Sequence, residues 1–335
     1  MKNYKLAVVG ATGLVGRTFL TVLEEKNLPI NEYIFLASKN SAGKIIKFNG
    51  KEYKINELNE SSFDDNIDFA FFCAGGDISK KYAPIAQSKG TIVIDNSSAF
   101  RMDPNVPLVV PEVNPDDLLT HNNIIANPNC STIQAVVPLK ILDDLYSIKR
   151  IVYFTYQAVS GAGKQGVDDL LLEENHKSPK KFPHTINNNC LPHIDSFEDN
   201  GYTKEEMKMI NETRKILHKP DLKITATCVR VPVINSHSEG INVELYNKFD
   251  LTQIKDTFNS SKGLTLLDDP SHNIYPLATL ASGQDNVLVG RIRKDESVDN
   301  GINFWCAADN LRKGAASNGV QILELLLTDK YNRKK

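Results

Sequence analysis

The residue with the clearest chemical signature is a cysteine that follows a turn and opens a helix. Cys130 ends the run Asn127-Pro128-Asn129-Cys130, and two hydroxyl residues, Ser131 and Thr132, come directly after it. Asn and Pro are typical of turns and hydroxyl residues of helix starts, whereas structural cysteines usually lie inside apolar runs. A helix N-terminus favours a thiolate and lowers the pKa of a thiol. We therefore predict that Cys130 is a nucleophile.

The other four cysteines do not share this pattern. Cys73, Cys228 and Cys306 lie inside apolar runs, which is typical of inert core residues, and Cys190 has no evident role. The cysteines are odd in number and form no CxxC pair, which argues against a disulfide framework and a zinc site. We expect no metal, and a reducing compartment, the cytoplasm.

A cysteine nucleophile usually needs a proton acceptor, and seven histidines are available. His237 follows a predicted strand at 224–233 and lies among polar residues, in the strand-end loop position where catalytic groups often occur. The residues alone leave the other histidines open. In the same strand Arg230 lies among apolar residues, where an unpaired charge would be costly.

A glycine-rich segment opens the first predicted helix. The run Gly10-Ala11-Thr12-Gly13-Leu14-Val15-Gly16 directly follows an apolar strand at 4–9. Glycines in this context let backbone amides approach a pyrophosphate at the positive end of a helix, although the spacing here is GxxGxxG instead of GxGxxG. We predict a dinucleotide site that includes Gly10, Thr12, Gly13, Leu14 and Val15. The alternative is a tight turn with close helix packing.

The end of the second predicted strand indicates which dinucleotide is bound. It reads Leu36-Ala37-Ser38-Lys39-Asn40-Ser41 and lacks the acid that usually holds the ribose hydroxyl of NAD. An acid would repel a 2′-phosphate, whereas hydroxyl groups and Lys39 could hold one. We predict NADP in preference to NAD, with Ser38 and Ser41 in the cofactor site. The alternative is a polar turn that discriminates nothing.

Two kinds of strand pattern must position these residues. Short apolar runs alternate with helical stretches in the first part of the chain, which predicts a parallel sheet with crossover helices; the runs are 4–9, 33–37, 67–73, 91–95 and 123–127. The second part has longer β-rich runs that predict one large sheet; these are 151–159, 224–233, 241–246, 286–293 and 302–308. The segment 173–202 is expected to be a loop or a small lobe.

The predicted fold class is α/β. A Rossmann-like NADP-binding domain is expected at 1–127, completed by a C-terminal helix at 310–330, and an α+β catalytic and dimerisation domain with a large mixed sheet at 128–309. Two strands of the second sheet alternate cleanly, so one face is free to meet another subunit, and we expect a homodimer.

Length and composition agree with two soluble domains. The 335 residues are too many for one ordinary domain, and 41% hydrophobic with 24% charged residues is typical of globular proteins. The net charge of -2 provides no overall field that would attract nucleic acid or an anionic membrane. The apolar run ILELLL near the C-terminus is far shorter than the roughly 20 residues a membrane span needs. We therefore expect a small-molecule substrate.

The motifs taken together resemble those of bacterial aspartate-semialdehyde dehydrogenases. The resemblance runs through nearly the whole chain, and its segments are GATGLVG, LASKNSAG, DNSSAFR, NPNCST, QAVSGAG, GYTKEEMK and CVRVPV followed by SHSEG. It implies reversible, NADP-dependent reductive dephosphorylation of L-4-aspartyl phosphate to L-aspartate 4-semialdehyde through a cysteine thioester. The product would feed the synthesis of lysine through diaminopimelate, and of threonine, methionine and isoleucine.

The resemblance also implies a role for each matched position. Cys130 would be the nucleophile, His237 the acid-base group, and Gln157 would orient the substrate. Inorganic phosphate would bind Arg101 and Lys208, whereas the carboxylate and amino group of the substrate would bind Arg230 and Glu206. The cofactor would contact Ser160 and Gly161 beside the nicotinamide, and Asn310.

Structural interpretations of the same residues remain open. Thr203 and Glu206 form a capping-box pattern, so Glu206 could simply satisfy a helix end. Lys208 could be a solvated helix charge, Gln157 a strand residue satisfied by backbone, and Arg101 one half of a surface pair with Asp103.

Three other functions also remain open. A related acyl-phosphate reductase, of the N-acetylglutamyl-phosphate type, would share the cofactor domain and the cysteine, but its acetylated substrate has no positive charge to pair with Glu206. A cofactor-independent thiol hydrolase would use the Cys130 and His237 pair but leave the glycine-rich loop unexplained. A non-catalytic regulator would bind NADP without turnover.

Overall fold

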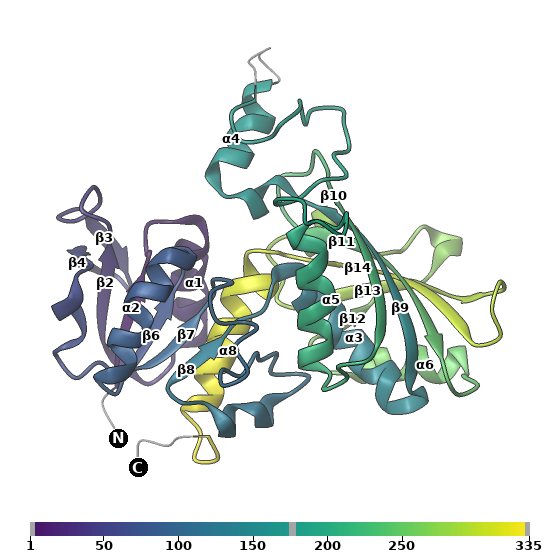
Figure 1. The fold of residues 1–335 in the computed structure, drawn as a ribbon, viewed down its shortest axis with the longest axis horizontal. Coiled ribbons are helices and arrows are strands. Elements are labelled where there is room, and N and C mark those ends of the chain that lie inside the picture. Colours follow the sequence, from purple (N-terminus) through teal and green to yellow (C-terminus); the bar gives the residue numbers. More distant parts are fainter. Residues whose placement is uncertain (1–3, 174–178, 332–335) are drawn as a thin grey trace. The chain divides into compact units, whose positions relative to one another are not determined.

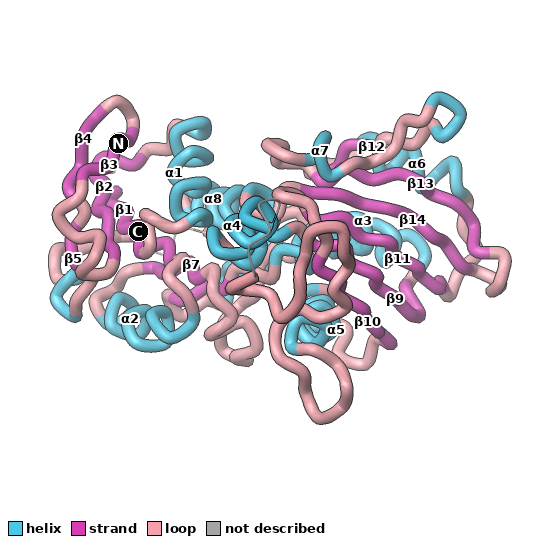
Figure 2. The backbone as a smooth tube through the Cα atoms, turned by 90° about the horizontal axis from the view of Figure 1, so that it is seen from above, coloured by secondary structure: helices cyan, strands magenta, loops and turns pink. Residues whose placement is uncertain are grey.

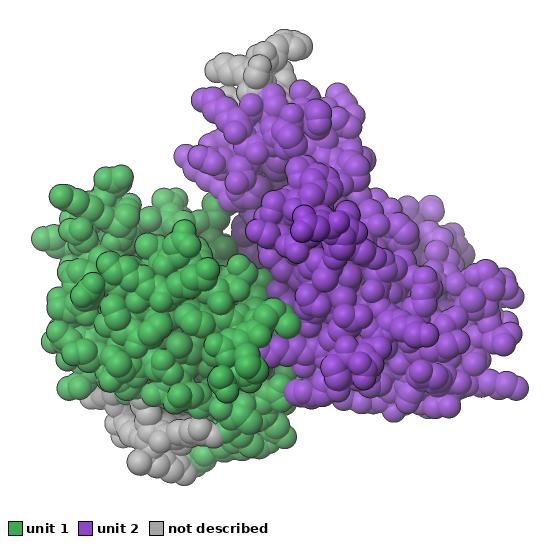
Figure 3. Space-filling view, in the orientation of Figure 1, with its two compact units in different colours: residues 1–128, 315–335 green, residues 129–314 purple. Residues whose placement is uncertain are grey.

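The computed structural model describes residues 4–173 and 179–331. The chain divides into two compact units, shown in Figure 3: unit 1 is residues 1–128 with 315–335, and unit 2 is residues 129–314. The division after Pro128 lies one residue beyond the expected boundary, and the return to unit 1 at Ala315 lies five residues later than expected. No described helix is long and apolar enough to cross a membrane.

Unit 1 contains the predicted parallel sheet. Six strands are ordered β5-β2-β1-β6-β7-β8, and every neighbouring pair is parallel. Their bounds are β1 Tyr4–Val9, β2 Ile30–Ala37, β5 Asn56–Glu57, β6 Phe69–Phe72, β7 Ile92–Asp95 and β8 Ile124–Ala126. The helices of this unit are α1 Leu14–Lys26, α2 Gly76–Ser88 and α8 Ser317–Leu326 (Figure 1). The Rossmann-like domain is thus confirmed.

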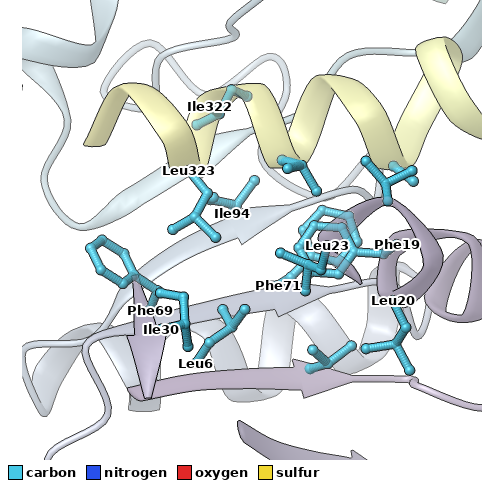
Figure 4. Packing of buried hydrophobic residues seen from close by; sticks show 14 of the residues in the cluster. Leu6, Phe19, Leu20, Leu23, Ile30, Phe69, Phe71, Ile94, Ile322 and Leu323 are labelled. Carbon is cyan, nitrogen blue, oxygen red and sulfur yellow. The ribbon is translucent and has the colours of Figure 1, made fainter. Parts of the chain in front are cut away.

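The core of unit 1 explains why the C-terminal helix returns to it. Phe19 of α1 stacks on Phe71 of β6 with ring centroids 3.6 Å apart. Leu323 of α8 lies near Ile94 of β7 in the same cluster, as Figure 4 shows. Each fully buried side chain of this size contributes about 1.5–3 kcal/mol, so α8 is held by burial although it is distant in sequence.

A short hairpin in unit 1 is absent from the sequence prediction. Strands β3 Ile45–Phe48 and β4 Lys51–Lys54 pair antiparallel around Asn49 and Gly50, which both have positive φ. An Asn-Gly pair between two short strands is a strong hairpin signal. Phe48 is buried, and its ring lies edge-on to that of Phe35 in β2. The hairpin therefore extends the core beyond β2.

Unit 2 is built on the predicted large mixed sheet. Its order is β10-β9-β11-β14-β13-β12, most of which can be followed in Figure 2. The outer pairs β9/β10 and β12/β13 are parallel and the inner pairs are antiparallel. The bounds are β9 Ile148–Gln157, β10 Lys223–Arg230, β11 His237–Leu245, β12 Leu264–Leu266, β13 Val287–Asp295 and β14 Gly301–Ala308.

One face of this sheet is covered and the other is open. The helices of the unit are α3 Cys130–Tyr146, α4 Lys164–Glu173, α5 Lys204–Ile216, α6 Leu251–Ser260 and the short α7 Ala278–Ala281. Along β9 the inward residues Tyr153 and Thr155 are fully buried, whereas Phe154 and Tyr156 point outward and are 48% and 37% exposed. The alternation gives the sheet a free apolar face.

The segment 173–202 is largely loop, with a small core of its own that it shares with α4. Ile186 and Leu191 pack with Leu170 of α4 and with Val159. The Asp169 carboxylate accepts backbone N–H groups from Lys180, Lys181 and Phe182. Residues 174–178 of this segment lie outside the described part of the chain. The remainder is a small lobe tied to the end of β9.

Candidate active site

Cys130 is the first residue of α3, as the turn chemistry predicts. The Asn129 side chain caps the helix, because its Oδ1 accepts the N–H of Ser131 at 3.0 Å and of Thr132 at 3.3 Å. Carboxylates of α5 hold Asn129 in turn: its backbone N–H donates to Glu212 Oε2 at 2.6 Å, and its Nδ2 donates to Glu205 Oε1 at 2.9 Å. The residue before the cysteine is thus fixed from both its main chain and its side chain.

His237 and Cys130 come together although 107 positions separate them in the sequence. His237 opens β11, is fully buried, and places Nε2 3.2 Å from the Cys130 sulfur. Its other nitrogen, Nδ1, accepts the backbone N–H of Ala158 at 3.0 Å. Burial, and then the nearby Arg230 charge, hold the pKa of His237 well below its usual value. The ring is therefore neutral beside the sulfur.

Arg230 is the last residue of β10 and lies close to His237. It is 5% exposed, and its Nη1 donates to the Ala158 carbonyl at 2.7 Å. Gly161 fits between it and the histidine: a Cβ at Gly161 would lie 2.9 Å from Arg230 Nη1 and 3.2 Å from His237 Cε1. Gly161, Arg230 and His237, which were all predicted as site residues, therefore lie next to one another.

Glu206 forms the capping box that the sequence pattern left open. Glu206 Oε2 accepts the backbone N–H of Thr203 at 2.7 Å, and Oε1 accepts that of Cys228 at 3.0 Å, so this carboxylate forms the capping box and anchors α5 to β10. The neighbouring Glu205 faces the site instead, since adjacent helical residues point about 100° apart. The capping box already uses Glu206, and this sequence signal could have identified Glu205.

Glu205 is the centre of a polar network. Its Oε1 accepts from Gln157 Nε2 at 3.2 Å as well as from Asn129, and its Oε2 is 3.2 Å from Lys208 Nζ. Burial acts to raise the pKa of Glu205, but Lys208, the Asn129 amide and Arg230 outweigh burial and lower it. The carboxylate is therefore ionised. Gln157 and Lys208 both lie in the site, and Lys208 also pairs with Asp195 at 2.8 Å.

Ser160 and Asn310 form a second pair near the histidine. Asn310 Nδ2 donates to Ser160 Oγ at 3.0 Å, and Asn310 Oδ1 accepts the backbone N–H of Ser236 at 2.8 Å. Both side chains are buried. Because Ser236 directly precedes His237, this pair also fixes the start of β11.

The predicted dinucleotide loop has the expected geometry within unit 1. Gly10 has φ +86, and a Cβ at Gly16 would lie 2.3 Å from the Gly10 carbonyl oxygen, so both positions require glycine. Gly13 precedes α1, which has no side-chain cap at its N-terminus. Thr12, Leu14 and Val15 complete the turn into the helix. These residues leave backbone amides at the helix start, which fits a bound pyrophosphate.

A second glycine pair was missed by the sequence analysis. Gly75 has φ +96 and begins α2 with Gly76, and the preceding residues Cys73 and Ala74 touch the first loop: a Cβ at Gly10 would lie 3.0 Å from Ala74 N. The two loops thus meet at the carboxyl ends of β1 and β6. Two glycines directly after an apolar strand were the available signal.

The remaining predicted residues of unit 1 lie in two places. Ser38 and Ser41 form the turn after β2, where Ser41 N donates to the Ser38 carbonyl at 2.8 Å, and no acid lies between them. Arg101 is 8% exposed, and its guanidinium donates to the carbonyls of Asn127 and Asn96 at 3.0 and 2.9 Å. The guanidinium of Arg101 is therefore buried and oriented by backbone carbonyls.

Gly314 is a site residue with no local sequence signal. A Cβ there would lie 2.8 Å from the Cys130 Cβ and 3.1 Å from its Cα. We expect Gly314→Ala to displace the nucleophile and lower kcat about 100-fold, since displacements of an ångström can cost that much. Steady-state kinetics would measure this. The control is Gly240→Ala, whose added Cβ would lie 3.6 Å from the Trp305 ring; equal rates for both variants would contradict the prediction.

Glu239 lies two residues after His237, and its buried carboxyl group should make the free energy of unfolding depend on pH. It is fully buried, and burial followed by the Glu205 charge raises its pKa well above the usual value. A glutamate in the unfolded chain ionises at about pH 4.3. Below that pH the neutral carboxyl of the folded protein makes its full contribution to stability. The contribution falls as the pH rises toward the pKa of Glu239 in the folded protein. Each pH unit in that window changes stability by about 1.4 kcal/mol.

Glu239→Gln removes this titration while keeping the shape of the side chain. We expect its Tm to match the wild type near about pH 4 and to exceed it increasingly at higher pH. Thermal unfolding of both proteins across this range would measure the difference. A Tm difference that does not change with pH would show that Glu239 is ionised in the folded protein.

The fold and the site define a class of enzyme. A dinucleotide-binding unit is joined to a unit in which a partly buried cysteine and a buried histidine lie beside an arginine and an ionised glutamate. This arrangement suits a dehydrogenase that works through a covalent thioester. Among the described residues, no group of three His, Cys, Asp or Glu side chains could hold a metal ion.

Comparison with known proteins identifies the family. Residues 5–121 match the semialdehyde dehydrogenase NAD binding domain, and residues 139–313 match the semialdehyde dehydrogenase dimerisation domain. Aspartate-semialdehyde dehydrogenase of Aquifex aeolicus is 52% identical, covering 98% of this chain and 99% of that protein. The Bacillus subtilis enzyme is 48% identical over 97% and 98% of the two chains. The chain belongs to the aspartate-semialdehyde dehydrogenase family.

A solved structure agrees. The crystal structure of aspartate semialdehyde dehydrogenase II from Vibrio cholerae, complexed with ASA, superposes on this structure with a TM-score of 0.93. The two sequences are 46% identical, and the match covers 98% of this chain and 99% of that chain. The fold class and the type of enzyme predicted from the sequence are thus confirmed.

Proposed function

We propose that this protein interconverts L-4-aspartyl phosphate and L-aspartate 4-semialdehyde with NADP(H), through a thioester on Cys130. The observation that carries the proposal is the 3.2 Å contact between the Cys130 sulfur and His237 Nε2, at the start of α3 and beside Arg230 and Glu205. Full-length similarity to aspartate-semialdehyde dehydrogenases supports the choice of substrate.

The charges of the site fit a free amino acid. Arg230 offers a buried guanidinium for the α-carboxylate, and Glu205 offers an ionised carboxylate for the α-ammonium group. Gln157, bonded to Glu205, would orient the substrate. The role first given to Glu206 therefore passes to Glu205.

Phosphate would bind cationic side chains from two elements. Lys208 lies one helical turn from Glu205, and burial, which lowers its pKa, is outweighed by Glu205 and Asp195, which raise it. Arg101 is the second candidate, because the carbonyls of Asn96 and Asn127 fix the orientation of its guanidinium.

The residues of unit 1 fit NADP. Gly10, Thr12, Gly13, Leu14 and Val15 would hold the pyrophosphate, and Ser38 and Ser41 would hold the 2′-phosphate with Lys39. The Candida albicans enzyme, 26% identical with a TM-score of 0.78, has been crystallised with NADP. In unit 2, Ser160, Gly161 and Asn310 would contact the nicotinamide end. When bound, the cofactor supplies the hydride transfer.

The protein's own groups provide the remaining steps. In the oxidative direction the Cys130 thiolate adds to the aldehyde carbon, and after oxidation the acyl group is a thioester on the sulfur. A phosphate oxygen then attacks the acyl carbon, the new C–O bond forms, the C–S bond breaks, and the thiolate returns. Arg230 and Glu205 hold the substrate through both steps, which converts each into a reaction between positioned groups.

The structure also bears on the rival substrates. An N-acetylated substrate carries no positive charge, so the ionised carboxylate of Glu205 would have no ammonium group of the substrate to bind. A thiol hydrolase would have no use for the two glycine loops of unit 1. Both observations support a free amino acid and a dinucleotide.

The test is NADP reduction by the purified protein with L-aspartate 4-semialdehyde, with and without inorganic phosphate. Sustained turnover that requires phosphate, with 4-aspartyl phosphate as product, is the expected result. NADP binding without any reduction would overturn the substrate assignment, and activity with N-acetylglutamate semialdehyde would replace it. Equal catalytic efficiency with NAD would overturn the cofactor preference.

The open face of the second sheet is the proposed dimer interface. It carries an apolar hollow of about 480 Å³ lined by Phe154, Tyr156, Leu277 and Trp305, and it lies within the part of the chain that matches the dimerisation domain. We expect Phe154→Asp to shift the protein from dimer to monomer, because a buried unpaired charge is costly at an interface core. Sedimentation velocity would measure it.

The control for this variant is Ile45→Asp, which places the same charge on an exposed side chain of unit 1. An unchanged dimer in Phe154→Asp would mean that another surface mediates association. None of the five cysteines, all of which the structure describes, forms a disulfide, and this supports the cytoplasm as the proposed location.

A further inference from the structure

The turn that carries Arg101 is built around one buried carboxylate. Asp95 is the last residue of β7 and is fully buried at the carboxyl end of the parallel sheet, the edge where such sheets bind ligands. Its Oδ1 accepts the backbone N–H of Ser97 at 3.1 Å, and its Oδ2 accepts the Ser97 hydroxyl at 2.7 Å. The Ser97 Oγ in turn accepts the backbone N–H of Ala99 at 3.1 Å. Asp95 therefore fixes the first half of the turn.

Arg101 closes the same turn through its guanidinium. Its Nη2 donates to the Asn96 carbonyl at 2.9 Å, and its Nε donates to the Asn127 carbonyl at 3.0 Å. Asn127 directly follows β8, and its own backbone N–H donates to the Asp95 carbonyl at 2.8 Å. The guanidinium is thus held at the ends of two neighbouring strands, β7 and β8.

A single peptide group joins the carboxylate to the guanidinium. The carbonyl that Arg101 contacts belongs to Asn96, and the N–H that Asp95 accepts belongs to Ser97, so both are parts of the peptide unit between residues 96 and 97. A peptide unit is planar, and in the trans form its carbonyl and its N–H point in opposite directions. By holding the N–H, Asp95 sets the direction of the carbonyl that orients Arg101.

A third hydrogen bond ties the carboxylate to α2. Ser79 is the fourth residue of α2 and is fully buried, and its hydroxyl donates to Asp95 Oδ1 at 2.6 Å. Burial raises the pKa of Asp95, whereas Ser79, Ser97 and the nearby Arg101 charge act to lower it. A buried carboxylate with three donors can hold the turn in one conformation.

We propose that Asp95 is a positioning residue for the phosphate that attacks the thioester, and that it acts by orienting the Arg101 guanidinium through the peptide between residues 96 and 97. This inference rests on the proposed function, in which Arg101 binds phosphate. A guanidinium binds phosphate through two parallel hydrogen bonds, which requires a fixed plane. Loss of the Asp95 contacts should weaken phosphate binding and leave Arg230 and Glu205, which hold the semialdehyde, unchanged.

The direct test is equilibrium dialysis of the full-length protein with radiolabelled inorganic phosphate in the presence of NADP. We expect Asp95→Asn to weaken phosphate binding about 10-fold, because an amide has one acceptor oxygen for three donors and the guanidinium loses its alignment. Asp68→Asn is the matched control: Asp68 accepts the backbone N–H of Lys5 at 2.9 Å and lies just before β6, at the opposite edge of the sheet.

Equal phosphate affinity in the wild type and Asp95→Asn would overturn the inference, and so would a wild type that binds no phosphate. The measurement needs no turnover. It therefore separates a failure of this inference from a wrong choice of semialdehyde.

Kinetics test whether Asp95 acts through Arg101. In Asp95→Asn the KM for phosphate should rise about 10-fold, while the KM values for L-aspartate 4-semialdehyde and NADP stay within about two-fold. In an Arg101→Ala background the same substitution should have almost no further effect, because the group that Asp95 positions is gone. A full effect in that background, or an equal rise in all three KM values, would contradict the inference and leave the proposed reaction intact.

Ser97 provides variants that keep the buried carboxylate. Ser97→Ala removes the hydroxyl between Asp95 and Ala99 and should raise the KM for phosphate several-fold. Ser97→Thr keeps the hydroxyl and should retain a KM close to that of the wild type. Ser97 is partly exposed, so neither change disturbs the core. Identical KM values in these two variants would show that Asp95 does not control the turn through Ser97.

Discussion

Cys130→Ser is expected to lower turnover of L-aspartate 4-semialdehyde by about 10⁴-fold or more, which is the usual cost of removing a covalent nucleophile. A serine hydroxyl is much less acidic than a thiol and would need a base to remove its proton. Burial and the Arg230 charge lower the pKa of His237, which makes the ring a weak base for a hydroxyl group. The variant should fold and bind NADP normally, since the cofactor loops lie in unit 1.

The measurement has two parts. Initial rates of NADP reduction give the loss of turnover, and mass spectrometry of the protein with substrate and NADP, without phosphate, detects the acyl adduct. The wild type should carry one adduct on Cys130 and the variant none. Cys190→Ser is the matched control, because Cys190 is exposed. A Cys130→Ser variant that retains a tenth of the activity would remove Cys130 as the nucleophile.

The second large effect concerns the two adjacent glutamates. Glu205→Gln should lower kcat/KM for the semialdehyde more than 100-fold, because losing a charged partner of a buried ammonium costs about 3 kcal/mol or more. Its Tm should change little by comparison, since the amide can still accept hydrogen bonds from Asn129 and Gln157.

Glu206→Gln is the paired variant, and it should behave in the opposite way. The amide would leave one backbone N–H, of Thr203 or Cys228, facing an NH₂ group, which costs about 1–3 kcal/mol of stability. Its kcat/KM should stay within a few-fold of the wild type. Loss of catalysis in Glu206→Gln with normal kinetics in Glu205→Gln would restore the assignment made from the sequence.

Patterns that are local in the chain predicted most of the architecture. Strand β1 and strands β6 to β8 appear as apolar runs because both faces of a parallel sheet are buried. The outward Phe154 and Tyr156 alternate with inward residues, which indicated one free face in the second sheet. The hairpin β3–β4 was missed because its exposed strands carry charges, although Asn49 and Gly50 are a clear turn signal.

The candidate site was less predictable because its contacts are long-range. Nothing local relates Cys130 to His237, and their pairing followed only from the family resemblance. Glu212 and Gly314 gave no signal at all, since their roles depend on how α5 and the segment after β14 reach the start of α3. We propose Glu205 in place of Glu206 because Glu206 caps the helix, and two adjacent identical residues can be told apart only by deciding which one forms the cap.

The main-chain origin of the Ala158 contact has a consequence for how this site can vary. Every amino acid except proline supplies the same N–H, so the side chain at 158 can change while His237 Nδ1 keeps this hydrogen bond. The effects of side-chain substitutions at position 158 would then reflect changes in packing, and not the loss of the hydrogen bond to His237. The group that orients the imidazole ring is supplied by the path of the backbone between β9 and the following turn, and so it is inherited with the fold.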